Sequence, residues 1–276
     1  MIKALSILFA ASALFGIAIA EEASSVSKDG KAALVDSLVG PTSVFLECGQ
    51  SDTWESVDLL KQRYGLTDAD MSVVMADVLE KTIGETNAAR KSVRAGAAMM
   101  LGRYGTADSL PLLRNVALAK EDPAAPLAFQ SYQALASLDK VVELVDATYD
   151  DPDCNSYRRM RGIFFWQTGK KVRDGGISAA QRSNLCAVMR KRAASGPDVR
   201  DVLEIDELLS LLDRDYASSR ERMINIGKAL NSGRPVDSFI MSNVRKRLEA
   251  ARDLVLEADR KKAVEAADGA GKGAGK

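Results

Sequence analysis

The chain contains no histidine among its 276 residues. This absence excludes serine and cysteine nucleophiles that rely on an imidazole base, and it excludes zinc sites built from imidazole ligands. The 38 lysine and arginine residues balance the 38 aspartate and glutamate residues, and aromatic residues make up only 5% of the chain. Balanced charge and few aromatics are not typical of a nucleic-acid-binding protein. We therefore expect no nucleic-acid partner, no metal and no cofactor.

Long apolar runs are confined to the first 20 residues. Residues 4–19 carry no charge, and the small residues Ala18 and Ala20 stand where a signal peptidase reads the chain. This pattern is typical of a secretory signal peptide over residues 1–20. The alternative is an uncleaved anchor, because the apolar segment is near the lower length limit for a membrane-spanning helix. The sequence predicts an exported protein, periplasmic or secreted, with no stable membrane span after cleavage.

Cysteine is scarce, and only Cys48, Cys154 and Cys186 are present. In an oxidising compartment three alternative pairings are open, each of which leaves one thiol over. We keep two interpretations: a disulfide between Cys154 and Cys186, or no disulfide at all. A catalytic cysteine is not expected, because no histidine is available to deprotonate it.

Sustained strand-type alternation of apolar and polar residues is also absent. Residues 21–30 are polar and expected to be disordered, and beyond them the apolar residues recur at helical spacing. Thr67, for example, precedes Met71, Val74 and Val78, a pattern that predicts a capped amphipathic helix. Further helices are expected over residues 31–39, 52–65, 87–103, 109–119, 125–138, 141–148, 155–168, 179–194, 199–212, 216–230 and 235–263. The chain is therefore predicted to be all-α.

An internal repeat begins within these helices. Residues 93–105 read Val-Arg-Ala-Gly-Ala-Ala-Met-Met-Leu-Gly-Arg-Tyr-Gly, and the leucine-rich stretch 110–113 follows. Related helix endings recur at residues 134–138 and 164–169, with spacings of about 31 to 34 residues that are typical of helical hairpin repeats. The motif resembles the HEAT-like (PBS-lyase-type) helical repeat family. Its members carry an arginine before an alanine-rich helix, a Leu-Gly ending and a leucine-rich partner helix.

The resemblance implies an α-solenoid of HEAT-like helical hairpins over residues 31–175. A longer C-terminal helical segment is expected over residues 176–266, and a flexible glycine-rich tail over residues 267–276. The last helix carries a nearly heptad apolar stripe, formed by Ile240, Val244, Leu248, Ala251, Val255 and Ala258. This stripe either packs on the preceding helices or pairs with a second copy of the chain, so a homo-oligomer is one alternative.

One segment suggests a binding surface. The four consecutive apolar residues 163–166 wrap around more than one face of a helix, so either that helix is buried all round or part of the run contacts another molecule. Arginines flank the run, and arginine and tryptophan are enriched at interface hot spots. The predicted partner-binding residues are Arg158, Arg159, Arg161, Phe165, Trp166 and Arg173.

Acidic residues cluster on a later helix at Glu204, Asp206 and Glu207. We interpret them as a solvent-exposed face, and no catalytic residue is predicted. The resemblance implies a non-enzymatic scaffold that presents a helical-repeat surface to a partner protein. Two alternatives stay open. One is a structural envelope component that self-associates through its C-terminal helix, and the other is a lyase-like enzyme with an inter-helix pocket, since some HEAT-like proteins are lyases.

Overall fold

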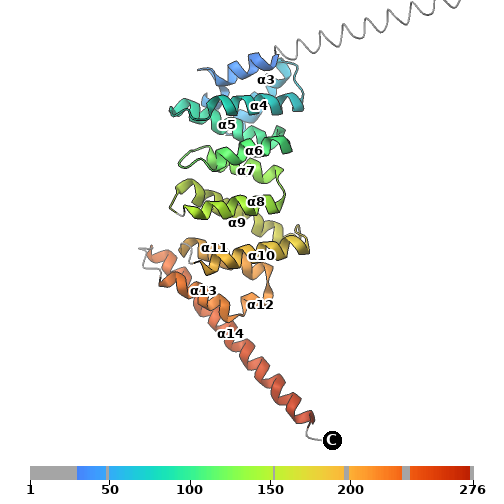
Figure 1. The fold of residues 1–276 in the computed structure, drawn as a ribbon, viewed down its shortest axis with the longest axis vertical. Helices are drawn as coiled ribbons and strands as arrows, with labels where there is room; N and C mark the ends of the chain where they lie inside the picture. Colours follow the sequence, from blue (N-terminus) through green and yellow to red (C-terminus); the bar gives the residue numbers. More distant parts are fainter. Residues whose placement is uncertain (1–29, 48–49, 152, 196–198, 232–236, 274–276) are drawn as a thin grey trace, which may run out of the picture. The chain divides into compact units, whose positions relative to one another are not determined.

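The structure is a computed structural model that describes residues 30–47, 50–151, 153–195, 199–231 and 237–273. Every regular element in these ranges is a helix, which confirms the all-α prediction. The chain divides into two compact units, residues 1–136 and 137–276. Figure 1 labels their helices in chain order. This division reflects which helices pack together. The predicted boundary between a HEAT-like repeat region (31–175) and a C-terminal helical region (176–266) is a different one, and it stays a prediction. The predicted signal peptide and the segment 21–29 lie outside the described residues.

The first unit consists of helices that follow one another along the chain and are joined by short turns. Residues 30–39 are helical. The helices that follow are α2 (Val44–Glu47), α3 (Gln50–Arg63), α4 (Asp68–Thr82), α5 (Ala88–Tyr104), α6 (Leu110–Ala117) and α7 (Ala125–Leu135), with the 3₁₀ turn η1 (Ala107–Ser109) before α6. The α4 helix begins as the sequence predicts, because the Thr67 side chain accepts a hydrogen bond from the amide of Asp70 and the Asp70 carboxylate accepts one from the amide of Thr67.

Helix α5 is the centre of this unit, since it packs against α2, α4 and α7. Its small residues permit close approach: a Cβ added to Gly102 would lie 2.7 Å from Ser131 Oγ of α7. Arg94 of α5 is buried, donates to the carbonyl oxygens of Thr82 and Glu85 and pairs with Asp122 at 2.7 Å. These carbonyls stand at or just beyond the end of α4, where a helix lacks intrahelical donors.

The second unit begins with α8 (Leu138–Ala147), the 3₁₀ turn η2 (Thr148–Asp150) and α9 (Asn155–Arg173). It continues with α10 (Ala179–Ala194), α11 (Val199–Leu212), α12 (Arg214–Ala217), α13 (Arg220–Leu230) and α14 (Ser238–Gly273). The central helix is α11, which contacts α9, α10, α12, α13 and α14. Helices surround α11 on several sides, so Asp201 and Asp206 are buried together with its apolar residues.

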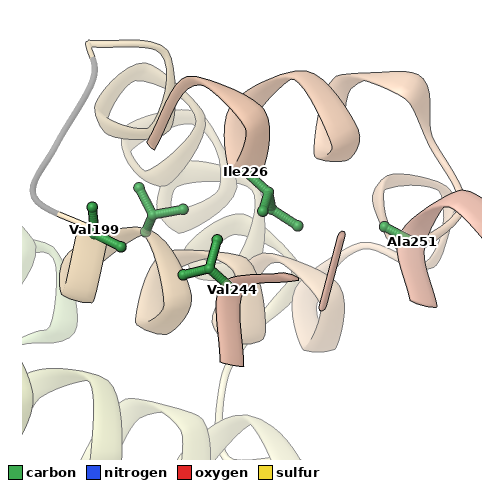
Figure 2. Packing of buried hydrophobic residues seen from close by; sticks show 5 residues of the cluster. Val199, Ile226, Val244 and Ala251 are labelled. Atoms are coloured by element: carbon green, nitrogen blue, oxygen red, sulfur yellow. The ribbon is translucent and has the colours of Figure 1, made fainter. Parts of the chain in front are cut away.

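Helix α14 packs along its first half. Val244 and Ala251 are fully buried, and they join Val199 and Val202 of α11 and Ile226 of α13 in one apolar cluster (Figure 2). Val255 is also buried, whereas residues 259–265 are exposed. Of the two interpretations of the stripe, the structure supports packing on the preceding helices over this half.

Several helix bounds differ from the sequence prediction; the expected helix 216–230, for example, is divided into α12 and α13, and two helices extend further than expected. Helix α9 continues past Thr168 to Arg173 and ends where Gly175 adopts a positive φ of 71°, with the Gly176 amide bonded to the Lys171 carbonyl at 2.8 Å. Helix α14 continues past residue 263 to Gly273, so residues 267–273 are helical where a flexible tail is expected. Adding residues to an established helix gains one hydrogen bond each, and this offsets the low helix propensity of the glycines.

Candidate binding groove

The four apolar residues 163–166 of α9 do not share one environment. Successive residues of a helix turn by about 100°, so four of them cannot all point toward one core. Phe164 and Phe165 are buried, while the Trp166 side chain is 69% exposed. Helix α9 packs against α8 and α11, and Trp166 is the member of the run that this packing leaves largely exposed. Trp166 is therefore accessible for the predicted contact with another molecule, whereas Phe164 is not.

Beside Trp166 a groove of about 200 Å³ lies between α9 and α11. One wall comes from α9 and the other from α11; the lining residues are Gly162, Phe165, Trp166, Gly169, Arg173, Glu204, Glu207, Leu208 and Leu211. Three of the predicted site residues, Phe165, Trp166 and Arg173, are thus brought together.

The two glycines of α9 let charged side chains of the groove lie close to the helix. A Cβ added to Gly162 would meet only Glu204 Oε1, at 3.9 Å. A Cβ added to Gly169 would meet the guanidinium of Arg173, at 3.6 Å from the nearer nitrogen. The Arg173 side chain therefore folds back over Gly169, and the end of the groove near Gly162 is left to Glu204.

Arg161, which we predicted as a partner-binding residue, lies inside the unit. Its side chain has no exposed surface; Nε donates to Asp201 Oδ1 at 3.0 Å and NH1 to the Thr148 carbonyl at 3.1 Å. Its guanidinium also lies 4.9 Å from the centre of the Tyr149 ring. In this position Arg161 cannot reach a partner, because a buried carboxylate and a helix-end carbonyl hold its guanidinium inside the unit. Its role is structural.

Arg158 and Arg159 stand at the start of α9 and do not line the groove. Arg158 pairs with Asp153 at 3.1 Å, and Arg159 is exposed. The structure therefore separates the predicted set into three places: the buried Arg161, the groove residues, and the two arginines at the first turn of α9.

The expectation that Glu204, Asp206 and Glu207 form a solvent-exposed face is wrong for two of the three. Asp206 is 1% exposed and bonds Arg222 through both carboxylate oxygens, at 2.8 and 3.0 Å. Glu204 is partly buried, and only Glu207 is exposed. The error arises because α11 has neighbours on several sides, which no periodicity within α11 reveals.

Burial changes the acidity of Glu204. Loss of hydration, reinforced by the negative charges of Asp201 and Glu207, raises the pKa of Glu204 from 4.5 to about 7, while Arg161 acts in the opposite direction. Glu207 has two cationic neighbours, Arg247 at 3.1 Å and Arg173 at 3.9 Å. The groove thus contains one exposed, paired acid and one partly buried acid with a raised pKa.

Cys154 and Cys186 are free thiols in the structure, so the disulfide considered between them is not formed. Cys154 is buried at the start of α9, and Cys186 lies on α10. Burial and the nearby charge of Asp213 raise the pKa of the Cys186 thiol, which is the opposite of what a reactive thiol requires. Cys48 lies outside the described residues.

No cluster of three or more histidine, cysteine or acidic residues suited to a metal ion occurs in the part of the chain that the structure describes. Among the described helices, none combines the length and the apolar character that crossing a membrane requires. Comparisons of the chain with protein-family models, with curated proteins and with solved structures give no match.

Sequence reasoning found the aromatic side of the groove and missed Gly162, Gly169 and Glu204. The two glycines are spaced seven residues apart in a helix and share a face with Trp166. This spacing was a usable signal for a groove, because glycine is unfavourable inside a helix unless something must approach closely. Glu204 carried no such signal.

Proposed function

We propose that the protein is an exported, non-enzymatic scaffold that binds a partner protein through the α9/α11 groove. The observation that carries this proposal is the exposure of Trp166 at a groove that also contains Phe165 and Arg173. Tryptophan and arginine are enriched at interface hot spots, and hot spots require a concave surface in which a partner side chain is shielded from water. Export rests on the signal-peptide pattern of residues 1–20.

An α-solenoid of HEAT-like hairpins is part of the proposal. In the first unit α5 packs against α7, and in the second α8 packs against α10 and α9 against α11, so helices two apart along the chain contact one another. Two layers of helices stacked in this way are what a solenoid of hairpins requires.

A recurring arginine also supports a repeat. Arg94 and Arg161 each lie on the second helix of a pair, are buried, and donate to the carbonyl that follows or ends the first helix, Thr82 in one case and Thr148 in the other. Each also pairs with an aspartate, Asp122 or Asp201. The two arginines are 67 residues apart in the sequence (161 minus 94), which is close to two hairpins of the expected length.

The size of the groove favours a protein segment over a small substrate. Ligand pockets of enzymes usually measure about 300–1,000 Å³ and bury most of their ligand. The groove measures about 200 Å³, enough for one long side chain. The lyase-like alternative has one observation in its favour, since an acid with a pKa of about 7 beside a groove can act as a general acid or base.

The variant Trp166→Ala tests whether the protein binds a partner through this groove. We expect the full-length chain, expressed with its export segment, to retain a partner protein in pull-downs from the compartment in which it accumulates, and Trp166→Ala to lose that partner. The matched control is Phe239→Ala, which removes an aromatic that is 72% exposed and does not line the groove. Circular dichroism checks the fold of both variants.

The outcomes are distinct. Equal retention by the native chain and by Trp166→Ala would contradict binding through this groove. Loss by both variants would place the contact elsewhere in the second unit. If no partner is retained and Glu204→Gln abolishes a measurable turnover, the enzyme alternative replaces the scaffold.

A further inference from the structure

Glu204 is the groove residue whose charge is least compensated by the protein itself. The nearest buried guanidinium, that of Arg161, is bonded to Asp201 at 3.0 Å. The other acid of the groove, Glu207, contacts Arg247 and Arg173. Within the described residues no lysine or arginine forms an ion pair with Glu204. A carboxylate that is removed from water without a cation is unfavourable, and an incoming cation relieves that cost.

The wall opposite Glu204 offers an aromatic face. Trp166 follows Gly162 by one helical turn, and a Cβ at Gly162 would lie 3.9 Å from Glu204 Oε1, so the Glu204 carboxylate lies beside α9 one turn from Trp166. A cation over a tryptophan ring is attracted by the ring quadrupole, and arginine in addition stacks its planar guanidinium on the ring. An aromatic ring and a carboxylate on two sides of one groove therefore match a guanidinium or ammonium group.

The positive charge of the groove stands at its other end. Arg173 folds over Gly169 and approaches Glu207 at 3.9 Å, away from the Gly162 end. Phe165, Leu208 and Leu211 supply apolar surface that suits the methylene stem of a long side chain. One arginine or lysine side chain also agrees with a volume of about 200 Å³.

Resting on the binding function proposed above, the geometry points to the chemistry of the partner: we propose that the groove binds an arginine or lysine side chain of a partner protein, with its charged group between Trp166 and Glu204. The occupant is thus a basic residue flanked by apolar ones. Glu204 supplies the charge that selects the cation, and Trp166 supplies the surface on which it stacks.

The test uses two short peptides that differ only in charge, acetyl-Leu-Arg-Leu-amide and acetyl-Leu-citrulline-Leu-amide. Trp54 and Trp166 are the two tryptophans of the chain, so Trp54→Phe in the full-length protein leaves Trp166 as the fluorescent reporter. Titrations are run at about pH 8, above the raised pKa of Glu204, so that this acid is ionised. We expect the arginine peptide to change the Trp166 emission in a saturable way and to bind at least about tenfold more tightly than the citrulline peptide.

Variants identify the group that selects the charge. Glu204→Gln keeps the shape of the side chain and should reduce the affinity for the arginine peptide to that for the citrulline peptide. Glu143→Gln, at an exposed position of α8 outside the groove, should keep the difference. Gly162→Leu should abolish binding of both peptides, whereas Gly227→Leu, in a helix of the same unit with nothing within 4 Å of its Cβ position, should not.

Equal affinity for the two peptides, or an undiminished preference for arginine in Glu204→Gln, would overturn the proposal. Its failure is distinguishable from failure of the proposed function. If Trp166→Ala loses the partner protein and Glu204→Gln retains it, the groove is a docking surface for an occupant of other chemistry. If Trp166→Ala retains the partner, the groove itself is not the contact.

Discussion

At the scale of single residues, arginine has a recurring structural role in this protein. Arg90 donates to the Val39 carbonyl at 2.6 Å, Arg161 to Thr148 at 3.1 Å and Arg182 to Leu212 at 2.9 Å. Carbonyls at the C-terminal end of a helix have no intrahelical donor, and the negative end of the helix dipole favours a cation there. A cluster of arginines in this sequence therefore does not by itself indicate a surface for a partner.

Arg161 and Asp201 should be strongly coupled in stability. Replacing one member of a buried ion pair leaves a buried charge, so we expect Arg161→Met or Asp201→Leu alone to lower the free energy of unfolding by about 3–5 kcal/mol. The double variant should lose much less than the sum of the two single losses, because no charge then stays unpaired. Urea denaturation of all four proteins gives this coupling energy, and additive losses would show that the two side chains act independently.

Glu204 should make stability depend on pH. Its pKa is about 7 in the folded protein and 4.5 for the free side chain, so between these values the folded state holds the proton more tightly than the unfolded state. The free energy of unfolding contributed by this group therefore falls as pH rises from about 4.5 to about 7 and is then constant. Glu204→Gln should gain up to about 3 kcal/mol over the native chain at pH 8 relative to the difference near pH 4, at about 1.4 kcal/mol for each unit of pKa. Denaturation at the two pH values checks this, and a pH-independent difference would contradict it.

At the scale of elements, the helical glycines fall into two kinds. Gly102 of α5 is required by packing, because a Cβ there would lie 2.7 Å from Ser131 Oγ and 3.3 Å from Ser131 Cα of α7. Gly162 of α9 faces the groove and has no such contact. The first glycine positions two helices, and the second keeps a surface open.

These two glycines should respond to alanine with opposite signs. Gly162→Ala should raise the free energy of unfolding by about 0.5–1 kcal/mol, because alanine restricts the unfolded chain and favours the helix. Gly102→Ala should lower it by about 1–3 kcal/mol, because α5 and α7 must separate. Thermal and urea denaturation measure both; a loss of stability in Gly162→Ala would mean that this part of the groove is closed.

At the scale of the whole molecule, the C-terminal half of α14 contributes little to the fold. Beyond Val255 its described side chains are largely exposed, and the ion pair between Arg220 and Asp259 at 3.1 Å is exposed as well. A chain that ends at Arg260 should therefore unfold within about 1 kcal/mol of the full-length chain, as expected for loss of surface residues. A chain that ends at Ala250 loses the buried Ala251 and Val255 and should be clearly less stable. Thermal denaturation of the two truncations compares them.

The sequence was sufficient for the helices whose starts are encoded locally, and insufficient for what surrounds them. Thr67 and Asn87 stand at the predicted starts of α4 and α5, and both side chains accept hydrogen bonds from the first turn. The burial of Arg161 and Asp206 and the partial burial of Glu204 could not be predicted in the same way. Their environment depends on residues of other helices. Asp206, for example, contacts Arg222 of α13 and Arg247 of α14.

The glycines of α9 have an evolutionary consequence. If the chain were selected in the laboratory for heat resistance alone, substitution of Gly162 by alanine would be among the first changes favoured, since it strengthens a helix and meets no obstacle. Bulkier replacements there would have to displace Glu204 and would close this end of the groove. Retention of glycine at this position under such selection would have to come from a second pressure, namely the need to keep a ligand.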